Sequence, residues 1–529
     1  MFLGDIDSVG NASALNTCAT SESRVGSRKF QYSRRPPRYS HEALALEACS
    51  GDSCCASFHS PDICRLNPPG KIAQLSVVAF ATIVLCSGAA SRGTRRISRG
   101  SSLSLGLRLR EIRSGFEPAF WIANLTELFE RLAYYATAAV LAIYLNEQLH
   151  FSSQLTGWLI GTFGLVVWFL PILGGTLADR FGFRRALLFA YLVMTLGYFL
   201  LGSLSAPWME PLRRALSDKW LVLAILLVPA LGPGVVKPCV AGTTARASNE
   251  NVRSLGYSIY YTIVNIGGAL GPIIAWLVRK QLGLGIESVF RVAAASVFLM
   301  FWTTLFFYRE PVRLGEQKVE SVSAALRNMF VVLGNWRFVA FLLISSGFYI
   351  VFWQEFISAP LFVRKYINPQ ADVDLLLSVD PIVVICLQIL VAYLTRRMAA
   401  IRAIALGFLC AGLSWVILAI HPTVLSVVAT FAVLATGEVI QASRYYEYIS
   451  RLAPPGQQGV YMGYAFLPVA IGYFIAGGLG GYLLHEFGDE LGRPQQMWWV
   501  IAAIGAVTAA MMWLYDRFLT PAAVSSPAP

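Results

Sequence analysis

Charged residues are scarce in this chain. Only 14% of its 529 residues are Asp, Glu, Lys or Arg, whereas 56% are hydrophobic. Because a soluble globular domain normally devotes about a quarter of its residues to charge, this composition excludes an ordinary soluble protein. The sequence therefore indicates a membrane protein.

Motifs for nucleotide and metal chemistry are also lacking. No G-x-x-x-x-G-K-[ST] string occurs, which disfavours an ATP-driven pump. The nine cysteines and five histidines follow no spacing typical of a metal site. We therefore expect no enzyme activity, no metal and no cofactor, with protons as the coupling ion.

The net charge of +12 would suggest nucleic acid as the partner of a soluble domain. Here, however, roughly half of the excess lies before residue 117, and much of the rest lies in short connections. A membrane protein concentrates Lys and Arg in its cytoplasmic connections. The charge is therefore explained by topology, and we expect no nucleic acid partner.

Long apolar runs recur along the chain from about residue 118. Each is near the roughly 20 residues that a helix needs to cross a bilayer, and lipid offers no partner to backbone groups outside a helix. Twelve such runs are predicted near 118–146, 155–178, 184–205, 219–243, 255–278, 289–308, 336–360, 376–396, 400–420, 424–450, 460–484 and 496–516.

The distribution of Lys and Arg predicts the orientation of these spans. Positive residues gather before the first span and in the connections after the second, fourth, sixth and eighth. By the positive-inside rule, these connections and both termini are cytoplasmic, in the cell membrane. Exceptions on the opposite side include Arg279, Lys280, Arg364 and Lys365.

A charged connection divides the twelve spans into six and six. We expect residues 116–310 and 336–518 to form two helical bundles, joined by a cytoplasmic linker at 311–335. Residues 1–115 are expected to be a disordered extension or the product of translation upstream of the true start; a thirteenth span or signal-like segment at 72–90 is the alternative. Residues 519–529 are expected to form a disordered tail.

The connection after the second span reads GTLADRFGFRR, from Gly175 to Arg185. Asp179 can accept charge-assisted hydrogen bonds from a neighbouring arginine or helix end. Topology alone would explain the arginines but not Asp179. The string resembles the signature loop of the major facilitator superfamily, and the resemblance implies a gating role for Asp179, Arg180 and Arg184.

The first span carries three ionisable residues in an apolar pattern. Glu127, Glu130 and Arg131 share one helical face because they are spaced i, i+3 and i+4. Charges at membrane depth normally face a wet cavity and pair with partners, and Lys237 in the fourth span is a candidate partner. This near-neutral set suits a proton switch, because one proton unbalances it.

Three strings resemble motifs of the proton-dependent oligopeptide transporter family. They are ELFERLAYY in the first span, GPGVVKP in the fourth and YSIYYTIVNIG in the fifth. The resemblance implies that Glu127, Glu130, Arg131 and Lys237 form the proton-coupling group. It also implies that Tyr134, Tyr135, Tyr261 and Asn265 line the substrate cavity.

The chain departs from that family mainly in its second half. The arginine that is implied to hold a peptide carboxylate is replaced by Ala138. Glu438 is the first candidate to receive a cationic amine, against a structural ion pair, and Asp380 is the next, against a helix cap. Arg444 is expected in a cytoplasmic gate or at a solvated helix end. Glu355 is expected to be a polar residue near the outer mouth.

We predict an all-helical major facilitator fold and a proton-coupled symporter that imports di- or tripeptides by alternating access. One alternative is a relative that carries another solute, such as an amino-acid conjugate, nitrate or another anion. An alternative of another class is a receptor or scaffold without transport. The expected partners are a peptide-like small molecule and the lipid bilayer, and a monomer is expected.

Overall fold

The computed structural model describes residues 115–311, 332–454 and 458–519. Within these ranges the chain is almost wholly helical, and the only β-type pairing described is an isolated bridge between Phe116 and Ser248. Twelve helices in the described ranges are long and apolar enough to cross a membrane. The predicted fold class is therefore confirmed.

The described part of the first six spans and their connections contains eight α-helices and two π-helical turns. Short 3-10 turns at Pro207–Met209 (η2) and Glu250–Val252 (η3) connect some of them. In chain order the segments are α3 (Pro118–Ile143), η1 (Tyr144–Gln148), α4 (Ser153–Phe169), α5 (Pro171–Phe181), α6 (Phe183–Leu201), α7 (Glu210–Ala215), α8 (Asp218–Arg246), α9 (Arg253–Trp276), η4 (Leu277–Gln281) and α10 (Ile286–Phe307).

The second six spans follow the linker. Their segments are α12 (Trp336–Phe352), α13 (Gln354–Phe362), η5 (Val363–Ile367), α14 (Val373–Leu376), α15 (Val379–Thr395), α16 (Ala400–Ile420), α17 (Val424–Leu452), α18 (Gln458–Tyr464), α19 (Leu467–Leu483), η6 (Leu484–Glu490) and α20 (Gln496–Phe518).

Several spans are interrupted where the sequence requires it. Span two breaks between α4 and α5 because Pro171 has no backbone N–H to continue the ladder. Span eleven breaks between α18 and α19 at Ala465 and Phe466, shortly before Pro468. Span seven breaks at Trp353. The breaks divide these spans into separate helical segments.

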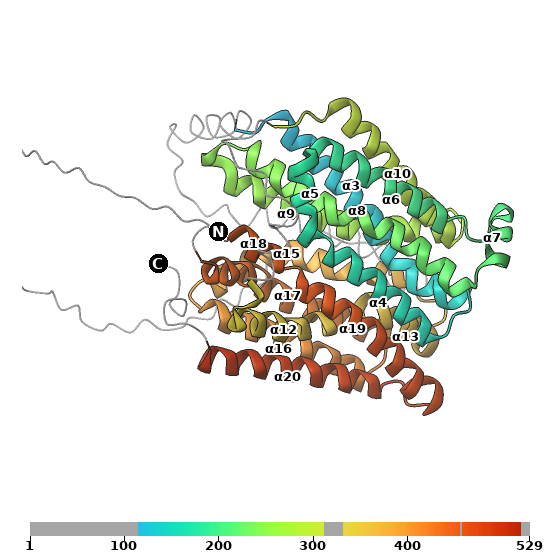
Figure 1. The fold of residues 1–529 in the computed structure, drawn as a ribbon. Helices are drawn as coiled ribbons and strands as arrows, with labels where there is room; N and C mark the ends of the chain where they lie inside the picture. Colours follow the sequence, from blue (N-terminus) through green and yellow to red (C-terminus); the bar gives the residue numbers. More distant parts are fainter. Residues whose placement is uncertain (1–114, 312–331, 455–457, 520–529) are drawn as a thin grey trace, which may run out of the picture. The chain divides into compact units, whose positions relative to one another are not determined.

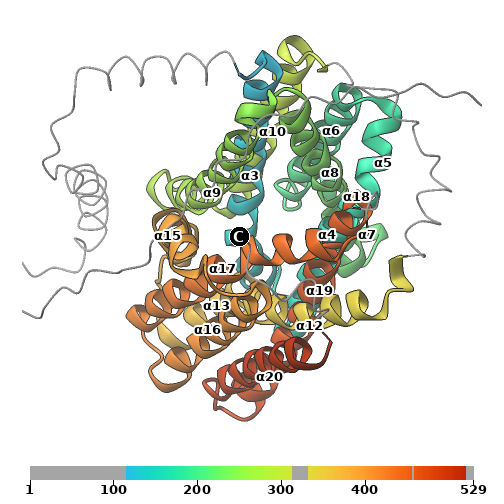
Figure 2. The same cartoon turned by 90° about the vertical axis from the view of Figure 1, so that its left-hand side faces the viewer.

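The two sets of spans form two groups that meet along several helix pairs. Figures 1 and 2 show the blue-to-green helices on one side and most of the yellow-to-red helices on the other. Contacts between the groups run from α4 to α19, from α9 to α15 and from α3 to α13. Within the groups, α3 packs on α9 and α10, and α16 packs on α17 and α20.

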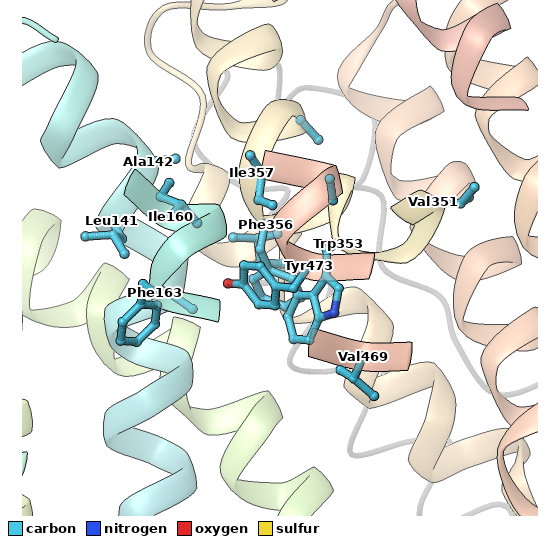
Figure 3. Close-up of a cluster of buried hydrophobic side chains, with 14 of the residues drawn as sticks. Leu141, Ala142, Ile160, Phe163, Val351, Trp353, Phe356, Ile357, Val469 and Tyr473 are labelled. Carbon is cyan, nitrogen blue, oxygen red and sulfur yellow. The ribbon is translucent and has the colours of Figure 1, made fainter. Parts of the chain in front are cut away.

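The main hydrophobic core crosses the boundary between the groups. Figure 3 shows Phe163 and Ile160 of α4 near Trp353, Phe356 and Tyr473 of the second group. All five side chains belong to one cluster of buried residues. Rings dominate this region, and Trp353 and Tyr473 have their centroids 4.1 Å apart. The two groups therefore share packed apolar surface in this conformation.

The predicted domain limits stay predictions. Residues 1–114, most of the predicted linker and residues 520–529 lie outside the described residues. Within the described residues, α10 ends at Phe307 and α12 begins at Trp336.

Candidate functional site

The charged face of α3 is fully enclosed. Glu127, Glu130 and Arg131 are each no more than 1% exposed. Arg131 donates from Nε and Nη2 to the two carboxylate oxygens of Glu130, with Nη2 at 2.5 Å, and its Nε lies 3.5 Å from Glu127 Oε1. The hydroxyl of Tyr260 on α9 also lies 3.5 Å from Glu127 Oε1. Glu127 Oε2 has no partner.

Lys237 faces this group from α8. It follows Gly234, and Pro238 comes directly after it, in a helix that also contains Pro229 and Pro233. The ammonium lies within electrostatic range of Arg131 and of both glutamates. No carboxylate among the described residues is within ion-pair distance of it; instead it sits 4.5 Å from the centre of the Trp168 ring. The structure thus brings together all four predicted coupling residues, with Lys237 not directly paired.

The tyrosines after the charged face point into different surroundings. Tyr134 is buried, with the Arg131 guanidinium 5.0 Å from its ring centre, and its hydroxyl lies beside Trp168 and Tyr473. Tyr135 is half-buried, and its ring centre lies 6.0 Å from that of Phe356 in the second group of helices. Tyr135 is therefore the member of the pair that reaches the boundary between the groups.

Tyr261 and Asn265 lie on α9. Asn265 donates its amide N–H to the carbonyl of Tyr261, so part of its capacity is used within the helix. The Tyr261 side chain is 37% exposed, yet it lies within electrostatic range of Glu438 and Asp380 of the second group.

Three acidic residues of the second group lie within electrostatic range of one another: Glu355 on α13, Asp380 on α15 and Glu438 on α17. Glu355 is fully buried and neither of its carboxylate oxygens has a partner; Asp380 Oδ1 also has none. None of the three forms an ion pair with a basic residue among the described side chains. Among the described residues, no group of three or more His, Cys, Asp or Glu side chains could hold a metal ion.

The structure changes the interpretation of two of these acids. Asp380 lies inside the first turn of α15 and makes no capping hydrogen bond, so the helix-cap alternative is not supported. Glu355 is predicted to be a polar residue near the outer mouth, and that place stays a prediction; the structure adds that its side chain is fully buried. It lies in the first turn of the short helix α13, directly after the break at Trp353, which the sequence pattern does not predict.

In the connection after the second span, the described side chain of Arg184 makes its contact within the first group. Gly182 has a φ of +85° and allows the tight turn before α6, whose first N–H, on Phe183, donates to Glu310. Arg184 donates to the carbonyl of Leu305 on α10. Arg180 is exposed, and the side chain of Asp179 falls outside the described residues.

Arg444 is held at the end of its own bundle. It donates to Glu447 at 2.7 Å and to the carbonyl of Thr395, where α15 ends. Glu447 also pairs with Arg451 at 2.7 Å. The geometry is that of a tied helix end, and a gating role for Arg444 remains a prediction.

Ion pairs join the two groups at the opposite ends of the helices. Arg279 donates through two nitrogens to Asp374 at 2.9 and 2.7 Å, Lys280 pairs with Asp372 at 2.5 Å, and Arg364 binds Glu147 through two nitrogens at 3.0 and 2.9 Å. These three pairs, which we call the outer latch, lie on the face that the positive-inside rule predicts to be outside. Sequence analysis found only the basic residues, as exceptions to that rule.

The outer latch depends on π-helical turns. Glu147 lies in η1, Arg279 and Lys280 in η4, and Arg364 in η5. A π turn widens the end of a helix and frequently marks a functional position. In each case the turn continues a membrane-spanning helix, so the charged side chains are held at fixed heights on the two groups.

Chemically, the site combines a compensated charge cluster with unpaired acids. In the first group, two carboxylates face two cations, and one carboxylate oxygen and one ammonium have no direct polar partner among the described residues. In the second group, the three carboxylates form no ion pair with a described basic side chain. This arrangement can exchange protons and can hold a small solute with a positive group near Glu438 and Asp380. Ala138 is 6% exposed in the core, so no cation stands at the position of the missing arginine.

Comparisons with known proteins agree on the fold. The family model of the Major Facilitator Superfamily matches residues 124–467 and 356–528. "Multidrug resistance protein MdtH" of Sodalis glossinidius is 25% identical over 394 residues, which cover 73% of this chain and 90% of that protein. The MdtH protein of Salmonella schwarzengrund is 22% identical over 404 residues, 75% of this chain and 94% of that protein.

Solved structures with the same fold include transporters with bound ligands. A POT family transporter in complex with 5-aminolevulinic acid has a TM-score of 0.64 at 16% identity and covers 76% of this chain and 96% of its own. An auto-inhibited POT family peptide transporter has a TM-score of 0.62 at 17% identity, covering 78% of this chain and 99% of its own. At these identities the likeness establishes the fold alone.

Proposed function

The chain belongs to the Major Facilitator Superfamily, and we propose that within it the protein is a proton-coupled symporter for small solutes that carry a positively charged amine, with di- and tripeptides as the first candidates. Alternating access between the two bundles would carry the solute across the membrane. Protons would act on the Glu127, Glu130, Arg131 and Lys237 group.

One observation carries the proposal: the charge cluster of the first bundle lies opposite acids that form no ion pair with a basic residue among the described side chains. Three buried charges and a half-buried lysine contribute little to the stability of a structural bundle, which argues against a receptor or scaffold. The cluster of the first bundle can respond to a proton because Glu127 Oε2 and the Lys237 ammonium are not paired directly. The acids of the second bundle favour a cationic group on the solute.

The substrate-binding role of Tyr135, Tyr261, Asn265, Glu438 and Asp380 is part of this proposal. Tyr135 lies within electrostatic range of Glu438 and Asp380, as Tyr261 does, so side chains from both bundles surround one region. Tyr134, which is buried behind them against Arg131, would support the charge cluster and reach a solute only after a rearrangement.

A second candidate is export of amphipathic organic cations in exchange for protons. It is favoured by the sequence relatives, which are named as multidrug resistance proteins. The absence of the carboxylate-binding arginine at Ala138 also fits a solute without a carboxylate. Aromatic rings beside unpaired acids are suited to such cations.

Transport in proteoliposomes separates these candidates. A labelled dipeptide and the lipophilic cation tetraphenylphosphonium are offered under an imposed pH gradient, with the membrane potential clamped. A symporter accumulates dipeptide on the side away from the acid, whereas an exchanger drives the cation toward the acidic side. The symport proposal would be withdrawn if acid outside failed to drive any dipeptide uptake.

Variants of two glutamates on the same helix provide the control. Glu130→Gln is expected to lose gradient-driven accumulation and to retain at most solute exchange. Glu117→Gln makes the same chemical change at the exposed beginning of α3 and is expected to transport like the wild type. Equal losses in both variants would indicate general damage to the fold.

A further inference from the structure

Spans two and eleven are broken at facing positions. α4 ends at Phe169 and α5 begins at Pro171, while α18 ends at Tyr464 and α19 begins at Leu467. The rings of Trp168 and Phe466, one beside each break, are stacked with centroids 6.1 Å apart and an interplanar angle of 29°. The segments beyond the breaks, α5 and α18, also touch.

The segments on the other side of the breaks are locked together. A Cβ atom added at Gly157 would overlap the carbonyl oxygen of Gly477, and one added at Gly161 would press on the backbone of Phe474. The backbones of α4 and α19 are therefore in direct contact (Figure 1). Because this contact leaves no space for sliding, motion of α5 against α18 must be taken up at the breaks.

Trp168 also contacts the charge cluster of the first bundle. The Lys237 ammonium lies 4.5 Å from its ring centre, and the ring of Trp353 in the second bundle lies 5.9 Å away on a tilted plane. The indole N–H of Trp168 makes no hydrogen bond of good geometry among the described residues, and the Tyr134 hydroxyl is the polar group beside it. The Trp168 ring thus lies between a cation of its own bundle and two rings of the other.

We infer that Trp168 is a positioning residue that couples the Lys237 group to the hinge formed by the facing breaks of spans two and eleven. The inference rests on the proposed function for its role in transport. With the ammonium over its ring, Trp168 stays on Phe466 and α5 stays beside α18. When Lys237 turns toward a solute carboxylate or toward Glu127, the attraction to the ring weakens and the hinge is released.

Charged and titratable groups of two neighbouring helices act on Lys237. Glu127, Glu130 and Arg131 approach it from α3. Tyr260 reaches Glu127 from α9. A change of protonation at any of these groups alters the electrostatic force on the Lys237 ammonium. Through its contact with the ammonium, Trp168 then changes its packing on Phe466.

A series of substitutions at Trp168 tests the inference in transport. Trp168→Leu is expected to lower turnover about tenfold with little change in KM, which is the size of effect a desolvated cation–π contact can produce. Trp168→Phe keeps a ring and should recover most of the turnover. Trp158→Leu is the matched control, because Trp158 lies on the same helix, is 36% exposed and packs against Trp220 within the first bundle.

A second measurement is independent of the solute. Spin labels are attached to a ketone-bearing amino acid at positions 181 and 397, so that all native cysteines remain; Phe181 and Arg397 are exposed and lie on connections of different bundles. Trp168→Leu is expected to shift the distance distribution between the labels, and Trp168→Phe is expected to leave it near that of the wild type.

Lys237→Met distinguishes coupling from simple packing. In the Lys237→Met background, Trp168→Leu should cause little further shift, because the cation that acts on the ring is already gone. An undiminished shift in that background, or identical distributions for the wild type and Trp168→Leu, would overturn the inference. If the wild type moves no solute under any gradient, the proposed function fails, and the spin-label distances still decide this question.

Discussion

The two bundles handle buried charge in opposite ways. In the first, Arg131 binds Glu130 directly, lies near Glu127 and shares their surroundings with Lys237, so acids and bases nearly balance. In the second, Glu355, Asp380 and Glu438 repel one another without a described basic partner. One fold thus supports a self-compensated cluster and an uncompensated one, and the second needs a proton or a solute cation to reach the same balance.

Removing Arg131 should cause the largest loss of stability, because it breaks the charge balance of the first bundle. Arg131→Met leaves two carboxylates in a space that is closed to water, and breaking a buried pair in this way costs about 3–5 kcal/mol. Thermal unfolding in detergent should show a large loss of stability. The amount of the variant that is inserted into the membrane should fall as well.

A compensated variant is the control for that experiment. Glu127→Gln, Glu130→Gln and Arg131→Met together remove both signs of charge, and a buried pair replaced as a whole is often close to neutral in stability. The triple variant should regain most of the melting temperature and still lack gradient-driven transport. If it stays as unstable as Arg131→Met alone, charge balance is not what stabilises α3.

At the outer latch the two bundles share charge between them. Asp374 is fully buried, and its carboxylate accepts two hydrogen bonds from Arg279 of the first bundle. Arg279→Gln should destabilise the outer-closed conformation by about 2 kcal/mol, less than a fully buried pair because Arg279 keeps some contact with water. The helix ends that the outer latch joins should become more accessible to a membrane-impermeant reagent.

Lys280→Gln is the matched comparison, since the adjacent pair with Asp372 is more exposed. It should change accessibility by much less, because an exposed ion pair contributes only about 0–1 kcal/mol. Equal effects of the two substitutions would show that burial of Asp374 does not control the latch.

At Glu438 the expected effect is on solute affinity. Glu438→Gln removes the charge while keeping the shape, and the loss of a charge-assisted hydrogen bond corresponds to about tenfold weaker binding. The shift of melting temperature by a dipeptide should therefore need about tenfold more ligand. A neutral analogue of the same solute, acetylated at its amine, should bind both forms equally; a tenfold difference for that analogue would remove Glu438 from amine recognition.

Much of the fold could be predicted because the signals for it are local. The apolar runs, the i, i+3 and i+4 spacing of Glu127, Glu130 and Arg131, and the Gly–Pro segment around Lys237 are each readable within one helix. The outer latch could not be predicted, because its partners are far apart in sequence and are positioned by π turns that leave no composition signal. The burial of Glu355 depends on the break at Trp353, which a continuous helical wheel ignores.

Glu355 gives the smallest and most specific test of the contrast between the bundles. Both of its carboxylate oxygens lack a partner, so Glu355→Gln removes repulsion from Asp380 and Glu438 and loses no hydrogen bond. We expect the protein to be stabilised by about 1 kcal/mol, the opposite sign to the loss of a charge from the first bundle. Thermal unfolding in detergent measures the change. A loss of stability would mean that Glu355 has a cationic partner in the membrane-embedded protein, and that the second bundle is compensated after all.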